Sequence, residues 1–113
     1  MYRQQSSQWV VYLIHFDRPY QHARHYLGTT NDLSHRLRQH ASGCKYGGAR
    51  LMEVIVQAGI SWRVACTWVG GRELEKQLKG RHNGCLLCPI CKAERIASQM
   101  LDMVAESDTP FLP

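Results

Sequence analysis

No apolar run in the sequence approaches the roughly 20 residues that a membrane-spanning helix needs. The N-terminal stretch, MYRQQSSQ, is polar and does not resemble a secretory signal. Internal repeats and low-complexity segments are also absent, and 113 residues suffice for one domain. We therefore expect a single folded domain in the cytoplasm, without a membrane partner.

Acidic residues are scarce. The chain has 9 Asp and Glu against 14 Lys and Arg, a formal net charge of +5. The segment from residue 102 to the end contains three acidic residues and no Lys or Arg, so residues 1–101 carry a net charge of +8. A basic body of this kind attracts polyanions, of which nucleic acid is the commonest partner. The alternative is a basic surface that serves only solubility.

Cysteine is present in an odd number and is unevenly distributed, which is unlike the disulfide framework of a secreted domain. The five cysteines are Cys44, Cys66, Cys85, Cys88 and Cys91. The spacing is compatible with reduced thiols or with a metal site.

The first half of the chain predicts two strands and a helix. Residues 9–16, WVVYLIHF, are apolar at both alternating positions, which is typical of a central strand. Residues 25–30, HYLGTT, predict a second strand, joined to the first by a long hairpin loop over DRPYQHAR. The next helix has a predicted buried stripe and two candidate N-terminal caps. The stripe is Leu33, Leu37 and Ala41, and the caps are Asn31 and Asp32.

The second half predicts two further helices around a strand, and then a final amphipathic helix. The helix over residues 49–59 should turn Leu51, Ile55 and Ala58 inward and end at Gly59. A half-buried strand follows over residues 61–69, then a short helix over residues 72–80. The predicted fold is α+β, a small three-stranded and mostly antiparallel sheet flanked by helices.

Arg36 and His40 are four residues apart and therefore share one face of the predicted helix. Each lies one position before a residue of the buried stripe, so both side chains can lean into a cleft. The alternative is a surface arginine and a histidine that the helix dipole favours at the helix end.

Three segments of the sequence together resemble the GIY-YIG nuclease superfamily. They are VVYL (10–13), HYLG (25–28) and DLSHRLRQH (32–40), and GGRELEKQLKGRHN (70–83) resembles the helix that supplies the family's metal-binding glutamate. The resemblance covers about residues 9–91. Val10 stands where the family usually has its first glycine, and the stretch between the two tyrosines is longer than usual.

The resemblance implies a catalytic set of Tyr12, Tyr26, Arg36, His40 and Glu75. In this reading Glu75 holds a divalent cation, Mg²⁺ or Mn²⁺, as a Lewis acid for the scissile phosphate. Arg36 donates hydrogen bonds to phosphate oxygens. Tyr12 positions or deprotonates the attacking water, and Tyr26 and His40 complete the pocket.

Glu73 is the alternative to Glu75 as the metal ligand. The two carboxylates are two residues apart and point to different faces of the helix, and Glu75 borders the stripe of Leu74 and Leu78. The family's spacing also favours Glu75. Without a metal, Glu75 would form a salt bridge with Lys79 four residues later.

Basic and aromatic residues on loops and helix faces suit phosphate contacts and base stacking, although they are equally compatible with solvated surfaces. The candidate nucleic-acid-binding residues are Arg24, His25, Arg38, Lys45, Tyr46 and Lys79.

The segment HNGCLLCPIC offers four possible zinc ligands at three-residue steps: His82, Cys85, Cys88 and Cys91. A single Cys-x-x-Cys pair without a distant second pair makes this a weak zinc motif. The alternative is a buried thiol cluster that anchors the loop to the final helix.

The sequence thus predicts a metal-dependent endonuclease that hydrolyses phosphodiester bonds, with DNA favoured over RNA. The nuclease domain is expected over residues 9–106, between tails at 1–8 and 107–113. Family members usually take specificity from an attached domain, so cleavage here should be structure-directed, weakly sequence-specific, or guided by a protein partner. The alternatives are an inactive nucleic-acid-binding module of the same fold, and a zinc-stabilised adaptor.

Overall fold

The structure is a computed structural model, and it describes residues 8–42, 49–80 and 87–108. Its elements, in chain order, are β1 (Val10–Tyr20), β2 (Ala23–Thr30), α1 (Leu33–Ser42), α2 (Arg50–Gln57), β3 (Trp62–Val69), α3 (Arg72–Gly80) and α5 (Pro89–Asp108). No helix in these ranges is both long enough and apolar enough to cross a membrane.

One antiparallel sheet with the strand order β2-β1-β3 forms the centre of the fold. The predicted α+β class is therefore confirmed. β1 is the middle strand, and its residues from Val11 to Phe16 are all buried. This burial explains why the segment is apolar at every position except His15 instead of alternating.

The β1–β2 hairpin is longer than the sequence predicted. β1 continues to Tyr20, which pairs with Ala23, and Gln21 adopts a positive φ of 54° in the tight turn between them. The prediction of a long loop between the two strands was therefore wrong. The chain extends the hairpin instead, and β1 pairs with β3 only as far as Phe16.

β3 contains an irregularity that changes which face its residues occupy. Leu13 pairs with Cys66 and the next residue, Ile14, pairs with Val64, so Ala65 is an extra residue. Such a bulge breaks the two-residue alternation. Val64 consequently packs on the same side as Ile14, whereas Cys66 packs on the side of Leu13.

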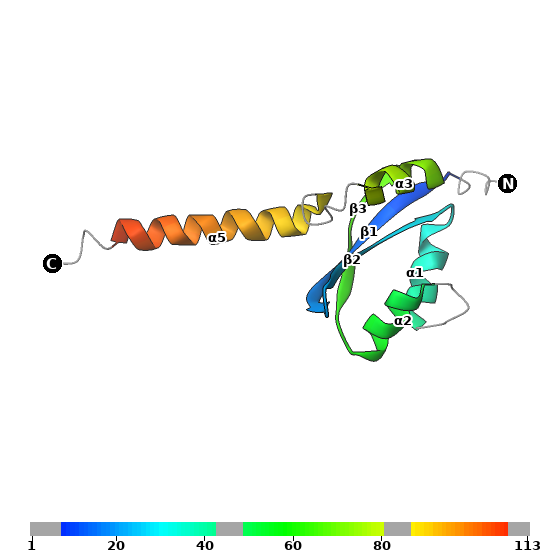
Figure 1. The fold of residues 1–113 in the computed structure, drawn as a ribbon, viewed down its shortest axis with the longest axis horizontal. Helices are drawn as coiled ribbons and strands as arrows, with labels where there is room; N and C mark the ends of the chain where they lie inside the picture. The colour runs from blue at the N-terminus through cyan, green and yellow to red at the C-terminus, as the bar shows by residue number, and fades with distance from the viewer. Residues whose placement is uncertain (1–7, 43–48, 81–86, 109–113) are drawn as a thin grey trace.

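Helices α1 and α2 cover one face of the sheet (Figure 1). The buried cluster on this face consists of Tyr12, Ile14, Phe16, Ala49, Met52, Ile55 and Ile60. Two residues predicted to be inward, Ala41 and Ala58, are exposed; the buried residues of α1 and α2 include His40 and Met52. The helices are thus rotated slightly from the predicted faces, and a histidine enters the core.

The predicted helix boundaries are confirmed by their hydrogen bonds. Asp32 caps α1, because its Oδ1 accepts a hydrogen bond from the His35 backbone N–H at 3.2 Å. Gly59 follows α2 with a φ of 72°, and Ile60 N–H bonds to the Ile55 carbonyl at 3.1 Å. This is the left-handed ending that a glycine permits.

The other face of the sheet carries a second, smaller core, formed by Leu13 with Cys88 and Cys91. Cys88 lies immediately before α5 and Cys91 in its first turn, and the helix then extends away from the sheet (Figure 1). Ile96, Met100 and Leu101 are 56, 60 and 69% exposed. The predicted final helix is therefore present, but Ile96, Met100 and Leu101 do not join the core.

Candidate active site

The hairpin brings Tyr12 and Tyr26 together beneath a glycine. Tyr12 lies opposite Gly28 in the strand pairing, and the two tyrosine rings have centroids 6.1 Å apart. A Cβ atom at Gly28 would lie 2.6 Å from the Tyr12 hydroxyl and 2.9 Å from the Tyr26 ring. Gly28 is therefore the residue that lets both rings occupy this position.

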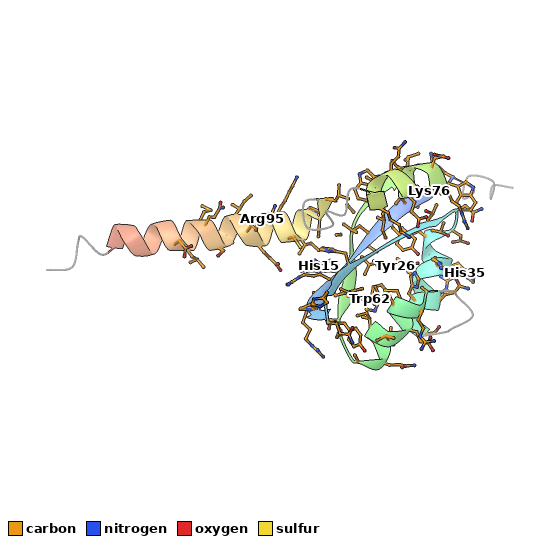
Figure 2. The ribbon with its side chains drawn as sticks, viewed as in Figure 1. His15, Tyr26, His35, Trp62, Lys76 and Arg95 are labelled. Carbon is orange, nitrogen blue, oxygen red and sulfur yellow. The ribbon has the colours of Figure 1, made fainter. Side chains whose placement is uncertain are left out.

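Helix α1 adds Arg36 and His40 to the tyrosines. The Tyr12 hydroxyl lies 2.8 Å from His40 Nε2, and Arg36 Nε donates to the same hydroxyl at 3.3 Å. The His40 ring also meets Tyr26 edge-on, with centroids 5.3 Å apart. Figure 2 shows Tyr26 on the side of the sheet that faces α1. Four of the five predicted catalytic residues therefore form one contiguous cluster.

Burial determines the protonation of this cluster. It raises the pKa of Tyr12 to about 12, although Arg36 acts in the opposite direction. Burial, assisted by the Arg36 charge, lowers the pKa of His40 to about 4. At neutral pH the phenol is protonated and the imidazole is neutral, so in the tautomer with the His40 proton on Nδ1 the Tyr12 hydroxyl donates to His40 Nε2 while it accepts from Arg36. The three groups form a directed chain of hydrogen bonds.

Arg36 is the fixed charge of the cluster. Burial would lower its pKa, but hydrogen bonds to Tyr12 and Tyr26 outweigh burial and raise the pKa above the ordinary value. The guanidinium is half-buried at the border of the α1 stripe, as predicted. It is a permanent cation beside a neutral phenol.

The low pKa of His40 gives the protein a specific acid sensitivity. Because the folded-state pKa of about 4 lies below the ordinary 6.5, the folded state favours the neutral ring. His40 therefore contributes its full stabilisation above pH 6.5, and this contribution is lost as the pH falls from 6.5 towards 4. We expect His40→Gln to be less stable than wild type at pH 7.5 but to lose less stability on acidification, as measured by thermal unfolding at pH 7.5 and 4.5.

His35→Gln is the matched control, because His35 is exposed on the same helix. The thermal stability of His35→Gln should change between pH 7.5 and pH 4.5 by as much as that of wild type. An equal stability difference between wild type and His40→Gln at both pH values would contradict the assignment of a neutral, buried His40.

Glu75 lies on α3, beside β2. One carboxylate oxygen accepts a hydrogen bond from the Thr29 hydroxyl, and the other lies 3.0 Å from the Lys79 ammonium. Thr29 follows Gly28, the residue opposite Tyr12. Glu73, in contrast, is exposed, which agrees with the prediction that the two carboxylates point to different faces. Among the described residues, the hydrogen bonds and ion pairs of Glu75 are to Thr29 and Lys79 and not to the tyrosine cluster.

The Glu75 carboxylate has the character that a divalent cation requires. Burial would raise its pKa, but the Thr29 hydroxyl and the Lys79 ammonium outweigh burial and lower the pKa below the ordinary value. The group is therefore ionised at neutral pH. Mg²⁺ is commonly bound by one or two carboxylates together with substrate phosphates and water. Glu75 fits this role, with Lys79 as the cation that a metal ion would displace.

Three of the candidate nucleic-acid-binding residues line one hollow. Arg24, His25 and Lys79 border a cavity of about 520 Å³, together with apolar residues that include Leu13 and Leu78. This hollow lies along β2 and does not include Arg36 or His40. Arg38 is exposed on α1. Lys45 and Tyr46 lie outside the described residues.

The candidate zinc residues are only partly described, because His82 and Cys85 lie outside the described residues. Cys88 and Cys91 lie within a compact group that also contains His15 and His25. Burial lowers the pKa of both histidines, that of His25 to about 4, so both rings are neutral. The sequence analysis did not include His15 and His25 in a metal site. The strand pairing could have indicated them: once Tyr12 is placed opposite Gly28, His15 falls opposite His25.

Arg36, a permanent cation at the border of a buried phenol and imidazole, can pair with phosphate oxygens, and the ionised Glu75 carboxylate can hold a metal ion that acts on a phosphate ester. Residues 8–84 match the family model of the GIY-YIG catalytic domain. The chain therefore belongs to the GIY-YIG family, and its domain is that of a nuclease, a phosphodiesterase that acts on nucleic acid. Members of this family typically use a divalent metal ion. No curated protein and no solved structure matched the chain.

Proposed function

We propose that this domain is a metal-dependent endonuclease that hydrolyses phosphodiester bonds of DNA in a structure-directed or weakly sequence-specific manner. The observation that carries the proposal is the hydrogen-bond chain from Arg36 through Tyr12 to His40. A module that only bound nucleic acid would have no need to bury a neutral histidine against a phenol. The predicted cytoplasmic location and a specificity-giving protein partner are part of the same proposal.

In this mechanism Arg36 binds the substrate. Its planar guanidinium can pair with two phosphate oxygens and stabilise the charge that develops as the phosphorus is attacked. Its hydrogen bond to the Tyr12 hydroxyl fixes the orientation of the side chain before substrate arrives. Bound phosphate is thus placed beside the phenol.

Tyr12 and His40 accept the proton that the attacking water loses. A phenol with a pKa of about 12 is a poor source of phenolate at neutral pH, which favours a relay over a free phenolate base. The attacking water gives a proton to the Tyr12 oxygen while the Tyr12 proton moves to His40 Nε2. The water oxygen forms its bond to phosphorus, and the leaving oxygen departs with the electron pair of the broken bond and takes a proton from solvent. His40 then returns its proton to solvent. The nearby phosphate charge raises the basicity of His40 in the complex.

Glu75 is the residue that would hold a divalent cation. When bound, the cation supplies Lewis-acid stabilisation of the scissile phosphate. The residues of the chain that support this role are Thr29, whose hydroxyl orients the carboxylate, and Lys79, whose charge keeps it ionised.

One observation favours a second function, an inactive nucleic-acid-binding module. Lys79 already neutralises Glu75, and the hollow that Arg24 and Lys79 border could bind phosphate without any chemistry. In such a module the Glu75–Lys79 pair would simply stabilise α3.

A panel of labelled substrates separates the two functions. Single-stranded, duplex and branched DNA, together with RNA, should be incubated with the protein in Mg²⁺, in Mn²⁺ and in chelator. We expect cleavage of DNA, greatest on branched or otherwise distorted substrates and absent in chelator. Binding to the same substrates without cleavage in either metal would favour the inactive module. Cleavage of RNA alone would contradict the proposed substrate.

A further inference from the structure

Four side chains meet on the face of the sheet opposite the tyrosine cluster. His15 comes from β1 and His25 from the paired position of β2, while Cys88 lies immediately before α5 and Cys91 lies in its first turn. Their candidate ligand atoms all lie within 4.8 Å of one another. Figure 2 shows His15 on the side of the sheet towards α5.

We propose that His15, His25, Cys88 and Cys91 together bind one structural zinc ion. Zinc sites of this composition are tetrahedral, with Zn–S distances of about 2.3 Å and Zn–N distances of about 2.0–2.1 Å, which place neighbouring sulfur and nitrogen ligands about 3.6 Å apart. The corresponding separations here are 3.5 Å from Cys88 Sγ to His15 Nδ1, 3.7 Å from Cys91 Sγ to the same nitrogen, and 3.3 Å from Cys91 Sγ to His25 Nε2. These three separations are those of neighbouring ligands in a zinc site.

Hydrogen bonding does not explain why a histidine is buried at this position. His15 is fully buried, and its Nε2 has no hydrogen-bond partner among the described residues. Its Nδ1 faces two sulfur atoms, which are weak hydrogen-bonding groups. A buried polar side chain with such poor partners is costly unless it serves another purpose. Coordination of a metal ion by Nδ1 would replace these two weak hydrogen bonds with a metal–ligand bond.

Charge balance also favours a zinc ion with this ligand set. Two thiolates and two neutral imidazoles around Zn²⁺ give a site with no net charge. A neutral site is compatible with the burial of Cys88 and Cys91, which are 0 and 6% exposed. Sulfur and imidazole ligands favour zinc over Mg²⁺ or Mn²⁺, which prefer oxygen. The site is therefore chemically distinct from Glu75.

The proposed ion has a structural role, because four protein ligands leave no open position for a substrate. Cys88 and Cys91 lie beyond residues 8–84, the part that matches the family domain. Ile96, Met100 and Leu101 of α5 are exposed, so this part of the helix does not pack against the sheet. The zinc ion would link the N-terminal end of α5 to the β1–β2 hairpin.

Metal analysis and X-ray absorption on the full-length wild-type protein test the site without any assay of cleavage. The protein should be purified in reductant without chelator. We expect about one zinc per chain, surrounded by two sulfur and two nitrogen atoms at zinc-site distances. Protein that contains no zinc should be titrated with Co²⁺, and we then expect the intense visible absorption of tetrahedral cobalt with a thiolate charge-transfer band. The absence of both signals would overturn the proposal.

The same spectrum distinguishes the two possible ligand sets. The set predicted from local spacing, His82, Cys85, Cys88 and Cys91, would give one nitrogen and three sulfur atoms. A spectrum with three sulfur atoms would overturn the assignment of His15 and His25. Because this measurement uses wild-type protein, it does not depend on whether any variant folds.

Variants provide an independent check on the individual ligands. Cys91→Ser and His25→Gln should lower the zinc content about tenfold or more and abolish the cobalt spectrum. Cys66→Ser is the matched control, since Cys66 is a half-buried thiol that packs against the same small core. It should retain zinc, and so should Cys85→Ser. Stoichiometric zinc in soluble Cys91→Ser and His25→Gln would overturn the site.

Discussion

Glu75→Gln should reduce cleavage about a thousandfold or more, because metal-assisted stabilisation of the scissile phosphate supplies several kcal/mol. The substitution preserves the size of the side chain and its ability to bond to the Thr29 hydroxyl. It removes the anionic oxygen that would hold the cation. It also removes a charge that repels phosphate, so nucleic-acid binding should be unchanged or slightly tighter. Single-turnover cleavage and binding should be measured on the best substrate from the panel, in Mg²⁺ and in Mn²⁺.

Glu73→Gln is the control for this prediction, because it makes the same change of charge on the exposed face of α3. It should cleave at nearly the wild-type rate. If Glu73→Gln were the inactive variant, or if Glu75→Gln cleaved as fast as wild type, the assignment of the metal ligand would be wrong.

Gly28→Ala should impair cleavage almost as strongly, although glycine offers no functional group. The added Cβ would lie 2.6 Å from the Tyr12 hydroxyl and 2.7 Å from the ring carbon that bears it. Tyr12 is fully buried and hydrogen-bonded to Arg36 and His40, so it cannot simply swing away. Overpacking of this kind costs about 1–3 kcal/mol of stability. The displaced hydroxyl would break the chain of hydrogen bonds, so the rate should fall by about a hundredfold or more.

Gly80→Ala is the matched control, because a Cβ atom there would have no neighbour within 4 Å. The double variant Tyr12→Phe/Gly28→Ala separates the two effects. Removing the hydroxyl removes the closest contact and should restore part of the lost stability, but it should not restore cleavage. Wild-type activity in Gly28→Ala would show that the position of the Tyr12 hydroxyl is unimportant.

The sequence predicted those parts of the fold and the candidate site that depend on neighbouring residues. The apolar run of β1, the Asp32 cap and the glycine that ends α2 are local signals, and each is confirmed. Arg36 and His40 share a helix face for the same reason, and the two strands that bear the tyrosines were recognised by their motifs. The predicted catalytic roles remain predictions.

Features that depend on the pairing of distant segments were not predictable in this way. Pro19 suggested a loop, but it lies beyond Phe16, where β1 no longer pairs with β3, so its missing N–H removes no hydrogen bond to that strand. The bulge at Ala65 breaks the alternation of β3, so Val64 and Cys66 pack on opposite sides of the sheet. His15 and Cys88, 73 residues apart in sequence, meet only once the sheet and α5 are packed together.

Strand β1 is therefore tolerant of some mutations and intolerant of others. Tyr12 faces the α1 side and His15 faces the α5 side, and only two residues separate them. Inserting or deleting one residue between them would reverse the faces of everything on one side of the change. With one residue more or fewer between them, Tyr12 and His15 could not both face the sides of the sheet that they occupy now. In a library of random variants, this segment should accept conservative apolar substitutions at Leu13 and Ile14 while rejecting every change of its length.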